Sequence, residues 1–247
     1  MNKLIRRAAI TCAATLALLP ATFSAQAESV NRAEVETIIK EYLVQNPEIV
    51  LEALQELDKR RLAEEESARK EAITGLSDEI YNSEYQIVLG NPDGDVTLVE
   101  LFDYNCGYCK RALSDLVRLV DEDKNLRVVL KEFPVLGKAS QEAARVAIAV
   151  AEVAPDKYED FHLALLSQPG RANLASSLKV AKDLGIADAD LEKSMKSSRA
   201  AETFQEVFTI AEQLGITGTP SYILGDEVIV GAVGYDTLKE KIAAERE

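Results

Sequence analysis

Two cysteines three positions apart, Cys106 and Cys109, have the residue type and spacing for thiol–disulfide chemistry. A β-branched, apolar run precedes them and a segment with helical spacing follows, so they lie at a predicted strand-to-helix junction. Cys106 would then sit at the helix N-terminus, where free N–H groups and the helix dipole stabilise a thiolate. Because the thiolate attacks in disulfide exchange, we expect Cys106 to attack and Cys109, one turn later, to resolve a mixed disulfide.

Two other uses of the pair have less support in the sequence. A structural disulfide across one helical turn closes too short a loop to add much stability. A zinc site would need two further ligands, and His162 is the only histidine in the chain. We therefore predict no metal site, and we interpret His162 as an ordinary, partly buried helix residue.

Two charged residues lie inside apolar strand patterns. Glu100 stands six positions before Cys106, and Lys131 is embedded in the next predicted strand. Burial of an ionised group is costly, and a buried Glu has a raised pKa, which suits proton transfer to a buried thiol. We expect Glu100 to assist proton movement with Lys131 as its partner. The alternative is that one or both side chains reach solvent at the strand ends.

The dipeptide Thr219-Pro220 comes immediately before a predicted hairpin. If its peptide bond is cis, a tight bend would expose the backbone of Thr219 beside the cysteines. An extended peptide could then hydrogen-bond there as an added strand. The alternative is a trans proline in a loop, which is the common state of X-Pro bonds.

The composition indicates a folded, acidic protein. Of 247 residues, 47% are apolar, and the net charge is −14, so nucleic acid and anionic membranes are excluded as favoured partners.

Residues 1–27 have the pattern of an export signal: a basic start, an apolar stretch, and the small-x-small sequence Ala25-Gln26-Ala27. We predict cleavage after Ala27 and export to an oxidising compartment, with a retained anchor as the alternative. Cleavage removes Cys12, three basic residues and no acidic ones, so the net charge falls from −14 to −17. The only two thiols left are those of the CxxC pair.

Residues 28–82 are predicted to form a helical arm. Helical spacing runs from 31 to about 80, with a second helix beginning at Asn46-Pro47 as N-cap and first-turn proline. Its apolar stripe is narrow, which favours a partner helix from another copy of the chain. The alternative is that this helix folds back onto the downstream domain.

Residues 83–247 are predicted to form an α/β domain. A strand at 96–102, a helix at 111–120 and a strand at 126–133 make a βαβ unit. Residues 138–214 contain helical segments only. A hairpin at 221–224 and 227–230 and a helix at 235–244 complete the chain.

These features together resemble the DsbA/DsbC group of thiol-disulfide oxidoreductases. The resemblance covers about residues 86–247 and depends on the order of four features: a strand, Phe102-Asp103-Tyr104-Asn105-Cys106-Gly107-Tyr108-Cys109-Lys110, a helical insertion and Gly218-Thr219-Pro220. It implies a thioredoxin fold with an inserted helical domain at about 138–214. It also implies a cis-Pro220 facing the cysteines and no cofactor beyond a Cys106–Cys109 redox disulfide. Gly107, Tyr108, Thr219 and Pro220 are then expected to contact substrate.

The dipeptide Gly107-Tyr108 and the threonine before Pro220 resemble the isomerase DsbC rather than DsbA oxidases. The helical arm on a DsbA-like body resembles the ScsC-type proteins, some of which are trimeric isomerases linked to copper tolerance. The resemblance implies a periplasmic homo-oligomer, with a trimer favoured. Its partners would be misfolded or reduced exported proteins and a membrane thiol reductase of the DsbD/ScsB type.

The sequence thus predicts a periplasmic disulfide isomerase or reductase. A DsbA-like dithiol oxidase is the first alternative. A copper-binding or holdase module, using the thiols as soft ligands, is the second and is not an enzyme.

Overall fold

The structure, a computed structural model, describes residues 31–247. The predicted export signal and its cleavage position after Ala27 lie outside these residues. Contacts along the chain divide it between Leu57 and Asp58 into two units. Within residues 31–247, no helix combines the length and apolar character needed to cross a membrane.

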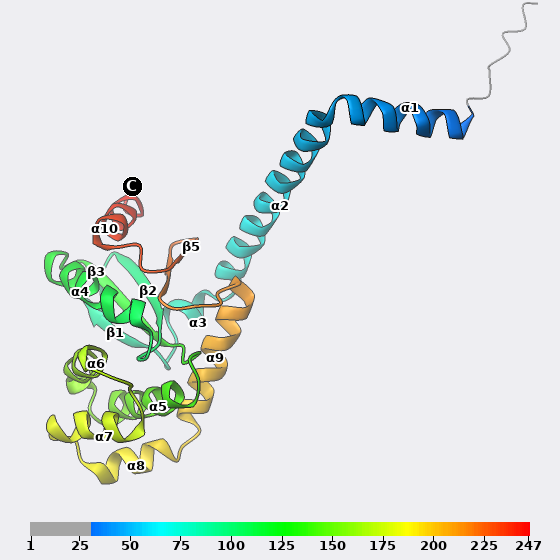
Figure 1. The fold of residues 1–247 in the computed structure, drawn as a ribbon. Helices are drawn as coiled ribbons and strands as arrows, with labels where there is room; N and C mark the ends of the chain where they lie inside the picture. The colour runs from blue at the N-terminus through cyan, green and yellow to red at the C-terminus, as the bar shows by residue number, and fades with distance from the viewer. Residues whose placement is uncertain (1–30) are drawn as a thin grey trace, which may run out of the picture. The chain divides into compact units, whose positions relative to one another are not determined.

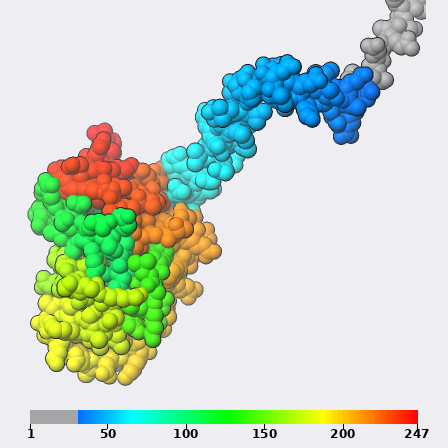
Figure 2. Space-filling view, in the orientation of Figure 1, coloured from blue at the N-terminus to red at the C-terminus, as the bar shows by residue number. Residues whose placement is uncertain are grey.

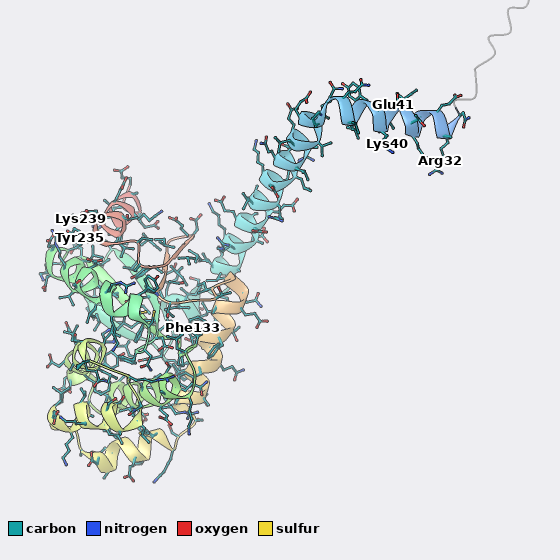
Figure 3. The ribbon with its side chains drawn as sticks, viewed as in Figure 1. Arg32, Lys40, Glu41, Phe133, Tyr235 and Lys239 are labelled. Carbon is teal, nitrogen blue, oxygen red and sulfur yellow. The ribbon has the colours of Figure 1, made fainter. Side chains whose placement is uncertain are left out.

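The first unit consists of α1 (Arg32–Gln45) and the start of α2 (Pro47–Gly75). The Asn31 side chain caps α1 by accepting a hydrogen bond from Ala33 N. Asn46 ends α1, and Pro47 begins α2 as predicted, because a first-turn proline needs no N–H acceptor. No residue of α1 is buried, and Arg32, Lys40 and Glu41 project into solvent (Figure 3).

The second unit is built on a five-stranded sheet in the order β1-β3-β2-β4-β5. β2 and β3 are parallel, and the other neighbouring strands are antiparallel. The strands are β1 (Ile87–Gly90), β2 (Val96–Phe102), β3 (Leu126–Glu132), β4 (Ser221–Leu224) and β5 (Glu227–Val230). Residues of β2 and β3 are almost all buried, because helices cover both faces of the sheet (Figure 1).

Different helices cover the two faces. On one face, α4 (Gly107–Glu122), α10 (Tyr235–Ala244) and the first insertion helices pack around Leu98, Phe102 and Leu130. On the other, α3 (Ser77–Tyr81), α9 (Arg199–Leu214) and Ile73 of α2 pack around Val99, Leu101 and Val129. Phe133, just after β3, packs against Phe208 of α9 with ring centroids 5.2 Å apart.

The segment between β3 and β4 is helical throughout. Its elements are α5 (Lys138–Val153), the 3₁₀ turn η1 (Pro155–Lys157), α6 (Tyr158–Ser167), α7 (Leu174–Asp183), α8 (Asp188–Met195) and α9. The space-filling view shows this insertion, coloured green to orange, continuous with the sheet and α4 (Figure 2). This topology confirms the predicted thioredoxin fold with an inserted helical domain.

Three features differ from the sequence predictions. β1 was not predicted, and its four residues pair antiparallel with β3. The helical arm was expected to extend to residue 82, but Ile73 and Ile80 are buried in the core of the second unit. The helix from Pro47 also stops at Gly75 rather than near Ile80, and α3 forms the remaining turn.

Candidate functional site

Cys106 lies where β2 gives way to α4. It is the N-cap residue of α4, with extended backbone angles (φ −76°, ψ 117°), and its carbonyl accepts the bond from Lys110 N. No side chain caps this helix end. The unpaired N–H groups and the helix dipole are therefore available to stabilise a Cys106 thiolate, as the spacing predicted.

The loop before β4 brings backbone against Cys106. The Thr219–Pro220 peptide bond is cis, as the resemblance implied. The Cys106 thiol donates to the carbonyl oxygen of Thr219, with Sγ and oxygen 3.1 Å apart. Pro220 is buried, while Thr219 is partly exposed. Thr219 and Pro220, 113 and more residues from Cys106 in sequence, thus form the opposite wall of the site.

Cys109 lies behind Cys106 in the core. Both cysteines carry free thiols, and Cys109 is only 1% exposed. Burial raises the pKa of Cys109 well above its usual value, and the nearby carboxyl of Glu100 adds to the rise. Cys109 is therefore a protonated thiol at neutral pH and needs a proton acceptor before it can attack.

Glu100 is buried in the middle of β2 on the same face as α4. Its register partner on β4 is Tyr222, whose hydroxyl donates a hydrogen bond to the Glu100 carboxyl. Burial raises the pKa of Glu100 to about 8, and the bond from Tyr222 opposes this rise. A carboxyl of this pKa beside Cys109 can exchange a proton near neutral pH, as the sequence suggested.

The predicted pairing of Glu100 with Lys131 is wrong. In the parallel register Glu100 lies opposite Leu130, and Lys131 lies opposite Leu101, so the two side chains point to opposite faces of the sheet. Lys131 Nζ instead binds a carboxylate oxygen of Glu206 at 2.8 Å and the carbonyl of Glu79 at 2.5 Å. Neither Glu100 nor Lys131 reaches solvent.

The two residues between the cysteines face outward. Tyr108 is 60% exposed, and the Arg111 guanidinium carbon lies 4.2 Å from the centre of its ring. Gly107 is also exposed at the first turn of α4. Both therefore lie where a substrate bound to Cys106 would contact them.

A profile of the DSBA-like thioredoxin domain family matches residues 97–243. The chain belongs to this family. A second profile, the N-terminal domain of the copper resistance protein ScsC, matches residues 31–64. Both parts of the predicted resemblance, the DsbA-like body and the ScsC-type arm, are confirmed.

Individual relatives agree with this assignment. A thioredoxin-like oxidoreductase from Silicibacter pomeroyi is 39% identical, with a TM-score of 0.66 over 68% of this chain and 96% of that one. ScsC of Proteus mirabilis in a transitional conformation is 29% identical over 88% of this chain and 97% of that one (TM-score 0.66). Disulfide bond formation protein D of Bacillus subtilis is 29% identical over 65% of this chain and 77% of its own length. The chain is a thiol-disulfide oxidoreductase of the DsbA and ScsC type.

The turn before the nucleophile is held by three side chains that belong to the motif of the resemblance but for which the sequence predicts no role. Asp103 accepts from Asn105 N (2.8 Å) and from Leu136 N (3.0 Å). Tyr104 reaches α6, where its hydroxyl lies 3.2 Å from His162 Nδ1. The side chain of Asn105 binds the insertion. The only signal in the sequence was an unbroken run of polar or aromatic residues just before Cys106.

A buried polar chain lies beneath this turn. The Tyr158 hydroxyl donates to Glu132 (3.2 Å) and lies 3.3 Å from the Tyr104 hydroxyl, which in turn contacts His162. His162 was expected to be partly buried, but it is 1% exposed, and burial lowers its pKa to about 3. Glu132 was not singled out at all, although burial raises its pKa well above the usual value. Burial disfavours the charged form of each of these groups, and their hydrogen bonds hold the turn in place.

Within residues 31–247, no group of three or more His, Cys, Asp or Glu side chains is arranged to hold a metal ion.

Proposed function

We propose that the protein is a periplasmic protein disulfide isomerase and reductase. The observation that carries this proposal is the position of Cys106 at the uncapped N-terminus of α4, 3.1 Å from the Thr219 carbonyl, with Cys109 buried behind it. A reactive thiol, a backbone surface for the client and a shielded second thiol are the three parts that disulfide exchange needs.

The chemistry balances without a cofactor. The Cys106 thiolate attacks one sulfur of a client disulfide, forms a Cys106–client disulfide and releases the other client sulfur as a thiolate. In isomerisation, another client thiolate attacks the client sulfur of this bond and returns Cys106 to its thiolate. In reduction, the ionised form of Glu100 accepts the Cys109 proton, Cys109 attacks Cys106, and the client leaves reduced while the Cys106–Cys109 disulfide forms.

The active-site residues favour isomerase over oxidase. Gly107-Tyr108 and the threonine before Pro220 match the isomerase pattern rather than that of a DsbA oxidase. Lys131 has no direct part in this chemistry, because it lies on the far face of the sheet.

The helical arm supports a homo-oligomer, and we favour a trimer. Eight large apolar side chains of residues 31–57 are 43–73% exposed, which is unusual for helices that work alone: Ile38, Ile39, Tyr42, Val44, Val50, Leu51, Leu54 and Leu57. Several Cys106 sites in one assembly would raise the local thiolate concentration around one misfolded client.

The expected surroundings follow from the export pattern at residues 1–27. In the periplasm the clients would be misfolded or reduced exported proteins. Because an isomerase must stay reduced, a membrane thiol reductase of the DsbD/ScsB type would return electrons to the Cys106–Cys109 disulfide.

A scrambled-disulfide refolding assay tests the function. The reduced protein should restore a scrambled client enzyme, Cys106→Ala should abolish recovery, and Cys109→Ala should accumulate a covalent client adduct. Rapid oxidation of a reduced peptide without recovery of the scrambled client would favour the dithiol oxidase instead.

The oligomer has its own test in the full-length chain. Leu51→Gln with Leu54→Gln should lower the mass in light scattering and reduce isomerisation, while reactivity of Cys106 with a small disulfide stays unchanged. Lys59→Gln on the same helix is the control. An unchanged mass for the double variant would contradict assembly through the arm.

A further inference from the structure

Basic side chains gather around Cys106 although the chain as a whole carries a net charge of −14. Lys110 Nζ contacts the carbonyls of Gln168 (3.0 Å) and Gly170 (3.1 Å). Arg111 lies over the Tyr108 ring. Arg171 contacts the Leu136 carbonyl at 3.4 Å. Within the described part of the chain, none of these three cations has a carboxylate at ion-pair distance, so their charges are available to a ligand.

A surface groove lined by Arg171, one of these three cations, lies between the first turns of α5 and α7. Its lining includes the apolar side chains of Ala139, Leu174 and Leu178 and the basic side chains of Lys138 and Arg171. Its volume is about 690 Å³, which is room for a few side chains of an extended peptide. We call this feature the insertion groove.

The one acid in the insertion groove is already occupied. Glu142 lies 3.6 Å from Lys138 Nζ and accepts a bond from Leu174 N at 3.4 Å. The positive charge of Arg171 therefore has no carboxylate partner among the residues that line the groove. An apolar lining with a surplus positive charge complements an apolar side chain next to an acid.

The insertion groove is joined to the nucleophile through one residue. Asn105, directly before Cys106, donates from Nδ2 to Ser140 Oγ (3.0 Å) and to the Ala172 carbonyl (2.9 Å), and its Oδ1 accepts from Ala172 N (2.8 Å). Ser140 follows Ala139, and Ala172 follows Arg171, so both partners of Asn105 adjoin the groove lining. Asn105 therefore fixes the residue before the nucleophile to the two segments that line the groove.

We propose that the insertion groove binds the client segment adjoining the cysteine that is joined to Cys106, and that it selects segments with an apolar residue flanked by acids. The inference rests on the proposed exchange function and adds a client preference to it. Thr219 binds the client backbone on one side of Cys106, and the groove binds side chains on the other. The cations act through attraction that salt screens.

Reaction of peptide disulfides with the full-length Cys109→Ala protein tests the proposal. Each peptide carries one cysteine as a mixed disulfide with 2-thiopyridine. Cys106 attacks the peptide sulfur, the new Cys106–peptide bond forms, and pyridine-2-thione leaves with its proton and is followed by absorbance. The peptides share a leucine beside the cysteine and differ only in flanking Asp or Lys residues. Neutral dithiodipyridine reports the intrinsic reactivity of Cys106.

The acidic peptide should react about tenfold faster than the basic one at low salt, and the ratio should shrink at high salt. Arg171→Glu should remove or invert the preference. Leu174→Ser should slow the leucine peptide but not one with glycine in its place. Lys179→Glu, an exposed site on α7 outside the groove, is the matched control and should keep the wild-type ratio.

Equal rates for the two peptides, or a preference that survives Arg171→Glu, would overturn the proposal. A parallel change in the dithiodipyridine rate would also overturn it, because the effect would then lie at Cys106 itself. No reaction of dithiodipyridine at Cys106 would instead overturn the thiol-exchange function beneath it.

Discussion

Glu100 and Lys131 occupy neighbouring strands one register step apart, yet their environments differ completely. On the α4 face, Glu100 meets the Tyr222 hydroxyl and the Cys109 thiol, and within residues 31–247 no cation pairs with it. On the α9 face, Lys131 has Glu206 at 2.8 Å and a backbone carbonyl. The buried charge of Lys131 is neutralised by Glu206. The Glu100 carboxyl is neutral only while it holds a proton.

This difference separates a structural role from a chemical one. The Lys131 charge is satisfied by Glu206 and a backbone carbonyl, although burial lowers the pKa of Lys131. A buried carboxyl without a cation has a raised pKa, costs stability at neutral pH and is ready to exchange a proton with the thiol beside it.

The largest expected effect follows from Glu100→Gln. The folded-state pKa of Glu100, about 8, lies above the ordinary value of 4.5, so its stability contribution is full below pH 4.5 and is lost as pH rises through 8. The variant should match wild type near pH 4.5 and exceed it by about 4 kcal/mol near pH 8.5, while release of reduced client slows. Urea unfolding across this pH range measures the difference. A difference independent of pH would contradict the buried, protonated carboxyl.

A smaller loss is expected from Lys131→Met. Within residues 31–247, it leaves Glu206 mostly buried with only Ser83 as a remaining side-chain partner, so the free energy of unfolding should fall by about 3 kcal/mol. The second change Glu206→Met should restore most of it, because both charges are then gone. Cys106 reactivity with a small disulfide should stay at the wild-type level in both variants. A drop in that reactivity would assign Lys131 to the chemistry after all.

The smallest effect is expected from Tyr222→Phe. Loss of its hydroxyl removes one hydrogen bond to Glu100, so the protein should lose about 1 kcal/mol at neutral pH. Because that bond lowers the pKa of Glu100, the pH at which stability falls should also move upward. A titration of unfolding free energy against pH, with Tyr85→Phe as the control at an exposed hydroxyl, checks both. A downward movement would mean that Tyr222 does not donate to the carboxyl.

Local sequence patterns were sufficient to predict most of the helices and strands. The limits of β2 and of the hairpin follow from apolar β-branched runs beside turn residues, and α10 matches its predicted range. β1 escaped prediction because four residues carry too little periodicity to separate a strand from a loop. Its strand state depends on pairing with β3, which is a long-range contact.

The residues of the candidate site also divide into those that a local sequence pattern predicts and those that it does not. The redox role of Cys106 and Cys109 could be predicted from the sequence, because two thiols separated by one helical turn have few other functions. The role of Asn105 could not be predicted, because an asparagine before a helix is an ordinary capping or turn residue. Its partners Ser140 and Ala172 are 35 and 67 residues away.

The sequence by itself determined the redox pair, its place at the start of a helix, and the order strand, insertion, Thr-Pro and hairpin, because these depend on local periodicity and short spacings. The tertiary structure alone decided that Glu100 and Lys131 face apart, that Thr219 meets Cys106, and that the insertion groove adjoins the nucleophile through Asn105. The physical reason is register: a parallel offset of one residue between β2 and β3 sends a side chain to the opposite face, and no local pattern encodes that offset.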